Sequence, residues 1–179
     1  KYPDVKLNLI NCITTETLEL LKNNKCDIAF LNLPVDDKDF ILSSAIMPLH
    51  DTFVANEKFA ALSEGVQPLK NMHDYPLLML DTNTVTRKAI INFSHSIGIH
   101  LHPEIECGSL ELMIQLAKNG VGIACVPKEY VKRELSEDKT LFEIKTEPAL
   151  PARSVGIAFP KGAAPSFAVR EFFKMFETD

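Results

Sequence analysis

The 179-residue sequence has no tryptophan and only three tyrosines. It also lacks any apolar run of the roughly 18 residues that a transmembrane helix needs, so no membrane partner is expected. Lysine and arginine number 19 against 24 aspartates and glutamates, which gives a formal net charge of −5. A surface that grips a nucleic-acid backbone needs clustered positive charge, so this chain is not expected to bind DNA by itself. No leader-like basic and apolar segment opens it, and we expect a cytoplasmic protein.

Recognisable catalytic patterns are missing as well. The sequence contains no GxSxG, no HExxH and no phosphate-binding loop, so we expect neither an enzyme nor a cofactor. Its four cysteines, Cys12, Cys26, Cys107 and Cys125, include no CxxC pair. That spacing disfavours a zinc or dithiol site and favours a reduced chain. A redox-sensing role for Cys12 or Cys107 is an alternative.

Two groups of side chains suggest a metal at first sight. One is His95, His100 and His102, and the other is the acidic segment 36–39. Two histidines on one strand face with no fixed third ligand are weak evidence for a metal. Lys38 interrupts the acidic segment. We expect solvated surface in both places and no bound metal.

The strongest local pattern covers residues 104–130. A short extended run, 104–107, is followed by Gly108 and then by Ser109, a good helix N-cap. Apolar residues then recur at helical spacing up to Gly120, and the apolar run 121–126 predicts a buried strand. The stretch therefore predicts a βαβ unit with a right-handed crossover.

Similar patterns predict further units along the chain. A strand at 76–80 opens onto the polar segment 81–87, which leads into a helix ending near Ser96. Nearer the start, we expect a strand at 6–11, a helix at 14–24 capped by Thr14 or Thr15, and a strand at 26–33. Ligands of α/β units bind off the carboxyl ends of strands, near helix N-termini. Cys107, Gly108 and Ser109 could bind a small anion there, or Gly108 and Ser109 could simply cap a helix.

The order of the predicted elements favours an α/β fold with two lobes. The first lobe takes residues 1–54 plus 156–179, and the second takes 55–155. The chain passes between the lobes twice, so two crossover strands join them. A hinge between lobes is a common position for a small-molecule site.

Several segments, in this order, resemble the effector-binding domain of bacterial LysR-type transcriptional regulators. They are YPDVKLNL, TLELLKNNKCDIAF, LHDTFVAN, YPLLMLDTNTVTR and EIECGSLELMIQLAKNGVGIACVP, with VGIAF near the end. The resemblance implies two Rossmann-like lobes in a type 2 periplasmic-binding-protein-like fold. It also implies a first strand and helix, a linker helix and an N-terminal winged helix-turn-helix, none of which this sequence contains.

The resemblance also implies a function. Family effector domains bind a small polar or anionic metabolite between the lobes, assemble as dimers or tetramers, and reach DNA only through the N-terminal domain. By position, the effector contacts here are Thr14, Asn32, Asn83, Thr84, Val85, Cys107, Gly108 and Ser109. A free-standing solute-binding protein of the same fold is the alternative.

Three of these positions carry specific expectations. Some family members have an arginine where Asn32 stands, and this arginine pairs with a carboxylate. Since this chain lacks the arginine, a dianionic ligand is not expected at that end. Arg87 is either an effector contact or a solvated residue. Replacing Thr84 with valine is expected to weaken effector binding and leave the fold intact.

Overall fold

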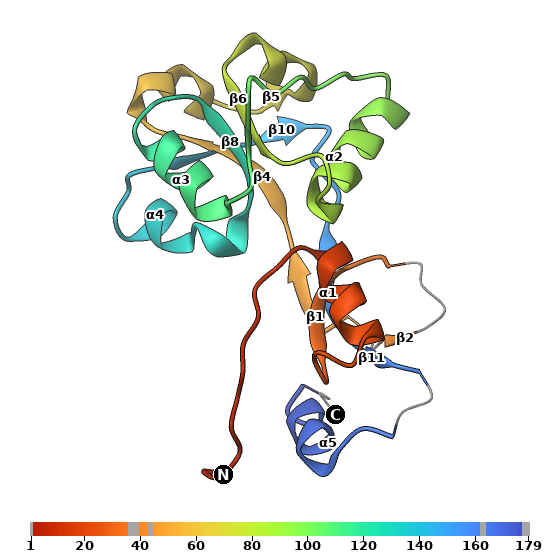
Figure 1. Ribbon diagram of the computed structural model, residues 1–179. Coiled ribbons are helices and arrows are strands. Elements are labelled where there is room, and N and C mark those ends of the chain that lie inside the picture. The colour runs from red at the N-terminus through yellow and green to blue at the C-terminus, as the bar shows by residue number, and fades with distance from the viewer. Residues whose placement is uncertain (1, 36–39, 43–44, 162–163, 177–179) are drawn as a thin grey trace. The chain divides into compact units, whose positions relative to one another are not determined.

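The computed structural model describes residues 2–35, 40–42, 45–161 and 164–176, and the acidic segment 36–39 lies outside these ranges (Figure 1). The chain divides into two compact units. The first combines Lys1–Pro48 with Ser154–Asp179, and the second is the continuous segment Leu49–Arg153. Within the described residues, no helix combines the length and the apolar character required to cross a bilayer.

The first unit is a small antiparallel sheet with helices. Its elements are α1 (Thr14–Lys22), β1 (Ala29–Leu33), β2 (Phe40–Leu42), β3 (Met47–Leu49), β11 (Arg153–Pro160) and α5 (Phe167–Phe173). The sheet has the order β1-β11-β2, and β3 also pairs with β11. A core forms between α1 and the sheet from Leu21, Ala29, Leu31, Phe40 and Ala158. Because the other three strands all pair with β11, this strand is the centre of the sheet.

The strand predicted at residues 6–11 is wrong. This segment has no regular structure, and Leu7 and Leu9 are 75% and 91% exposed. The alternating pattern supplies an apolar face, but a strand also needs a neighbour for its backbone hydrogen bonds. None of the described strands pairs with residues 6–11. The βαβ unit expected here is therefore wrong too, because β1 pairs antiparallel with β11.

The predicted cap of the first helix is also wrong. The N-cap is Ile13, without a side-chain hydrogen bond, and Thr14 is already the first helical residue. The hydroxyl of Thr17 donates instead to the carbonyl oxygen of Ile13, at 3.0 Å. The helix therefore starts one residue earlier than threonine capping predicts.

The second unit is built on a five-stranded sheet. Its strands and helices are β4 (Asp51–Ala55), η1 (Glu57–Ser63), β5 (Gln67–Pro68), η2 (Leu69–Asp74), β6 (Leu77–Leu80), α2 (Val85–Ser96), β7 (Ile105–Cys107), α3 (Leu110–Lys118), β8 (Ile123–Pro127), η3 (Lys128–Tyr130), α4 (Lys132–Ser136), β9 (Phe142–Ile144) and β10 (Thr146–Glu147). The order is β7-β6-β8-β4-β9, parallel from β7 to β8 and antiparallel at β4 and β9. The predicted strand–helix–strand order of 104–130 is confirmed, although β6 lies between its two strands.

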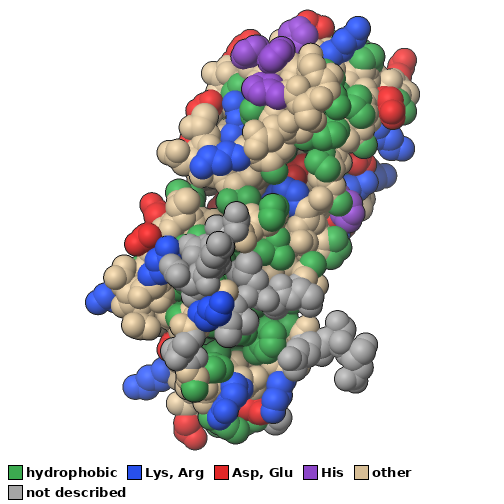
Figure 2. Space-filling view, turned by 90° about the vertical axis from the view of Figure 1, so that its right-hand side faces the viewer, with side chains coloured by type: hydrophobic (Ala, Val, Ile, Leu, Met, Phe, Trp, Pro, Cys, Tyr) green, Lys and Arg blue, Asp and Glu red, His purple; other side chains and the backbone are tan. Residues whose placement is uncertain are grey.

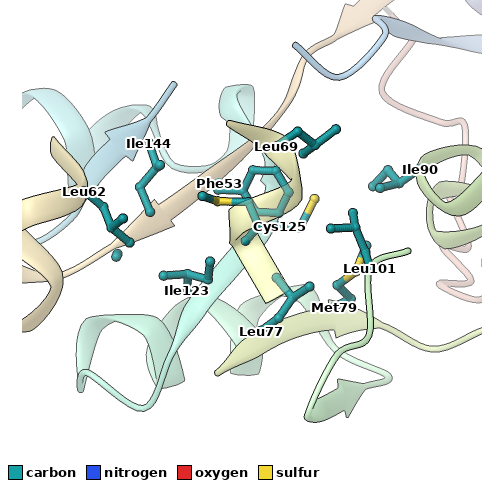
Figure 3. Close-up of a cluster of buried hydrophobic side chains, with 12 residues drawn as sticks. Phe53, Leu62, Leu69, Leu77, Met79, Ile90, Leu101, Ile123, Cys125 and Ile144 are labelled. Carbon is teal, nitrogen blue, oxygen red and sulfur yellow. The ribbon is translucent and has the colours of Figure 1, made fainter. Parts of the chain in front are cut away.

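Alternating side chains along these strands fill two cores, one on each face of the sheet. One core holds Phe53, Met79 and Cys125 with Ile90 of α2 (Figure 3). The other core holds the intervening residues, such as Val54 and Ala124, with Met113 of α3. Figure 1 shows α2 and α3 on opposite sides of these strands. Strand β8 is buried on both faces, which explains its nearly continuous apolar sequence.

A buried ion pair joins the beginning and the end of the second unit. The guanidinium of Arg153 donates to both carboxylate oxygens of Asp51, and Nη2 lies 2.9 Å from Oδ1. The two side chains are 4% and 1% exposed. The chain enters this unit at Leu49 and leaves it at Arg153. The ion pair therefore holds the first and last residues of the unit close together.

A second, more exposed pair lies at the turn before β4. Oxygen atoms of Glu129 accept from the backbone N–H of His50 at 3.0 Å and lie 2.7 Å from its Nδ1. Burial pushes the pKa of Glu129 up, but the hydrogen bonds from His50 outweigh burial and hold it below its usual range. The contribution of this pair to the free energy of unfolding is therefore fully present above the pKa of a glutamate in the unfolded chain. It is lost as the pH falls through the pKa of Glu129 in the folded chain.

The change Glu129→Gln should lower the free energy of unfolding at pH 7 by at most about 1 kcal/mol, because His50 is more than half exposed. Thermal unfolding of both proteins between pH 7 and pH 3 (roughly the range over which a glutamate titrates) should show this difference closing at acid pH. Glu104→Gln, at an exposed carboxylate, is the control. A difference that does not vary with pH would contradict the prediction.

Candidate functional site

Two parallel strands of the second unit end side by side. Leu80 of β6 is paired with Cys107 of β7, and the N–H of Asp81 donates to the carbonyl oxygen of Cys107 at 3.1 Å. Gly108 follows directly, and a Cβ atom at this position would lie 3.1 Å from Oδ2 of Asp81. The two strand ends and the loops that follow them therefore form one surface.

A helix begins directly after each of these strands. Thr84 is the N-cap of α2, and its hydroxyl accepts from the N–H of Arg87 at 3.2 Å and donates to the carbonyl oxygen of Asp81 at 2.8 Å. Ser109 is the N-cap of α3, as predicted, and accepts from the N–H of Leu112 at 3.2 Å. Each hydroxyl uses only one of the first N–H groups of its helix, which have no acceptor inside the helix. Backbone donors and the positive end of two helix dipoles thus face the same region.

The geometry of Thr84 changes the expectation for its replacement. Thr84→Val removes both hydrogen bonds of the cap and should cost about 1 kcal/mol of folding free energy, so the variant does not leave the fold unaffected. Thr84→Ser keeps the hydroxyl and should cost much less. Urea unfolding of the two variants measures the difference, and equal losses would show that the hydroxyl does not stabilise α2.

The structure brings together those predicted site residues that belong to the second unit. Asn83 and Ser109 are exposed, Thr84 and Val85 are half-buried, and Cys107 is buried at the end of β7. In the first unit, Thr14 begins α1 and Asn32 lies in β1, both half-buried. Thr14 does not follow the strand expected at 6–11, because the described chain has no strand before α1.

The thiols of the site and of the core are held in the neutral form. Burial raises the pKa of Cys107, and the nearby carboxylate of Asp81 raises it further. Burial raises the pKa of Cys125 well above its usual range. Reactive cysteines need a lowered pKa, so the surroundings of Cys107 do not favour a redox-sensing role.

Arg87 is the residue of this region that the sequence describes least well. Its side chain is 8% exposed, and Nη2 lies 3.6 Å from Oε1 of Glu106 in β7. The expectation of a solvated residue is therefore wrong. The sequence does contain one sign that Arg87 is unusual. A cation in the first turn of a helix lies at the positive end of the helix dipole, which is an unfavourable position.

The three histidines gather on the surface of the second unit. The ring centroids of His95 and His100 are 4.8 Å apart, and those of His100 and His102 are 6.4 Å apart. Figure 2 shows histidine side chains, in purple, clustered at the top of that view. Among the described residues, no group of three or more histidines, cysteines or carboxylates is placed to hold a metal ion.

Two helix N-termini that directly follow neighbouring parallel strands of a mixed sheet are typical of α/β proteins that bind small ligands. A family profile described as "LysR substrate binding domain" matches residues 1–179, so the chain belongs to that family, whose members are transcription regulators and not enzymes. The HTH-type transcriptional regulator YofA of Bacillus subtilis (strain 168) is 26% identical over 131 residues, 73% of this chain and 43% of that protein. The chain thus spans less than half of this relative. CmpR of Synechocystis, an HTH-type transcriptional activator, is 26% identical over 125 residues, 69% of this chain and 40% of that protein.

Solved structures confirm the fold. The regulatory domain of CcmR from Synechocystis PCC6803, in complex with 2-PG, matches with a TM-score of 0.86 at 18% identity and covers 98% of this chain and 83% of its own. The effector-binding domain of QuiR, in complex with shikimate, matches with a TM-score of 0.80 at 18% identity over 92% of this chain and 77% of its own. The fold is the type 2 periplasmic-binding-protein-like fold of LysR regulatory domains.

Proposed function

We propose that this chain is the effector sensor of a cytoplasmic LysR-type regulator and that a small polar metabolite binds at the ends of β6 and β7. The paired N-termini of α2 and α3 carry the proposal, because they offer backbone donors from two helices to one ligand. Asn83, Thr84, Val85, Cys107, Gly108 and Ser109 are the contacts on the second unit, and Thr14 and Asn32 are the contacts proposed on the first. Related domains with 2-PG and shikimate support a small ligand.

The proposed mechanism is a shift between conformations of the regulator. A ligand that binds one conformation more tightly increases its population by that difference in affinity. In a dimer or tetramer, the shift would change the spacing of N-terminal DNA-binding domains and so the contact with the operator. Self-association and DNA binding belong to this proposal.

Thermal unfolding against a panel of organic acids, amino acids, sugars and inorganic anions tests the sensor. A ligand that binds only the native chain stabilises it by about 2.7 kcal/mol at a hundredfold excess over its Kd. Asn83→Ala should reduce the shift, since Asn83 is exposed at the site. Asn92→Ala, on the exposed face of α2, is the matched control and should not. A panel without any saturable shift contradicts the proposal.

A further inference from the structure

The guanidinium of Arg87 occupies surroundings that disfavour a cation. Its side chain is 8% exposed, and it stands in the first turn of α2, where the helix dipole is positive. Nη1 is buried and has no hydrogen-bond partner among the described residues. The carboxylate of Glu106 is 3.6 Å from Nη2, which is an ion pair but beyond hydrogen-bond reach.

The electrostatic balance at Arg87 is unfavourable. Burial lowers its pKa below the usual range, and the attraction of Glu106 offsets only part of this effect. Glu106 is itself 43% exposed, so water weakens its field at the guanidinium. A buried cation with unused donors is costly, so its presence at this position calls for an explanation.

Arg87 connects the loop after β6 with the last residues of β7. Its backbone N–H is bound by the hydroxyl of Thr84, in the loop after β6. Its guanidinium reaches Glu106, the residue just before Cys107 and Gly108, at the end of β7. The unused donors therefore lie near the end of β7, on the face of the sheet that α2 covers, because Glu106 is paired with Met79 and Met79 packs with Ile90 of α2.

We propose that Arg87 is the charged anchor of the effector and that the effector carries one singly charged anionic group, a carboxylate, which replaces Glu106 as the partner of the guanidinium. The inference rests on the proposed function, because it concerns the same site. Asp81 and Glu106 would repel a second negative charge, and Asp81 is placed to accept from a hydroxyl or amine. A small monoanionic hydroxy or amino acid fits this combination.

The test compares Arg87→Met, which keeps the apolar stem, with Glu106→Gln and with Lys88→Met as an exposed control. Affinities are measured by calorimetry at constant ionic strength for lactate, benzoate and shikimate, with lactamide and benzamide as neutral counterparts. Sulfate, a dianion, is included for comparison and should bind more weakly than the monoanions. We expect Arg87→Met to weaken anion binding roughly tenfold or more, as loss of a charge-assisted hydrogen bond does. Glu106→Gln should strengthen it because a competing carboxylate is removed, and Lys88→Met should change it little.

Stability separates this role from a structural one. If Arg87 awaits an anion, Arg87→Met removes an uncompensated buried charge, and Tm should stay the same or rise. A lower Tm or a failure to fold, or weaker binding in both Arg87→Met and Glu106→Gln, would show that the pair only holds the loops in place and would overturn the inference. Wild-type chain that binds neutral compounds and no anion would also overturn it, while leaving the sensor function standing. A wild-type chain that binds nothing contradicts both.

Discussion

Replacing Asp51 with alanine is expected to lower the free energy of unfolding by about 3 to 5 kcal/mol. The change takes a carboxylate that is 1% exposed away from the Arg153 guanidinium, which is 4% exposed. A buried charge that loses its partner keeps the cost of leaving water without the attraction that balanced it. Urea unfolding, followed by circular dichroism, measures the loss.

The control for Asp51 replaces both partners with apolar residues. Asp51→Leu combined with Arg153→Met removes both charges and should recover most of the stability lost in Asp51→Ala, since buried pairs often exchange for apolar packing at little cost. If the double variant were as unstable as the single one, the pair itself, and not the uncompensated charge, would account for the loss.

Replacing Gly122 with alanine should cost about 3 kcal/mol, at the upper end for an added methyl group in a packed interior. A Cβ atom there would lie 2.2 Å from the carbonyl oxygen of Pro76 and 2.7 Å from Cδ1 of Leu78. The Pro76 oxygen cannot move away freely, because it accepts from the N–H of Ile123 at 2.9 Å, beside the pairing of β6 with β8. The backbone must therefore shift locally, where β6 pairs with β8 in the centre of the sheet.

Thermal unfolding of Gly122→Ala against Val121→Ala checks this second prediction. Val121 is the neighbouring residue and is 37% exposed, so its truncation should cost less than about 1 kcal/mol. Similar Tm values for the two variants would show that the strands can separate enough to admit the methyl group.

The parts of the fold that the sequence predicts well are those with strong local signals. Ser109 caps α3, and Gly120, with a φ of +69°, ends it. Around this end the Nζ of Lys58 donates to the Gly120 oxygen at 2.9 Å. Capping residues and glycines act within a few residues, so the pattern of 104–130 is readable without knowledge of the rest of the chain.

Apart from the cap of α1, the failures depend on distant partners. Residues 6–11 have the alternation of a strand, but alternation does not say which strand pairs with them. The direction of β1 is set by β11, near the other end of the chain. The burial of Arg87 depends in the same way on Glu106 and on the packing of α2, which no local pattern contains. The candidate site was therefore predicted from two strand-to-helix junctions. For Arg87 the sequence left open an effector contact or a solvated residue, and it did not predict the burial of the side chain.

The position of β11 in the chain has a consequence for synthesis on the ribosome. Among the described residues, strands β1 and β2 both pair with β11 and not with each other, so neither has this neighbour until the region of Ala158 has been made. At about 5–20 residues per second, this delay is roughly 10 s. All strands of the five-stranded sheet lie in the continuous segment between, so that sheet can close first. During the delay β1 and β2 have open edges, which are prone to pair with other chains, and the nascent first unit is the part that a chaperone would need to protect.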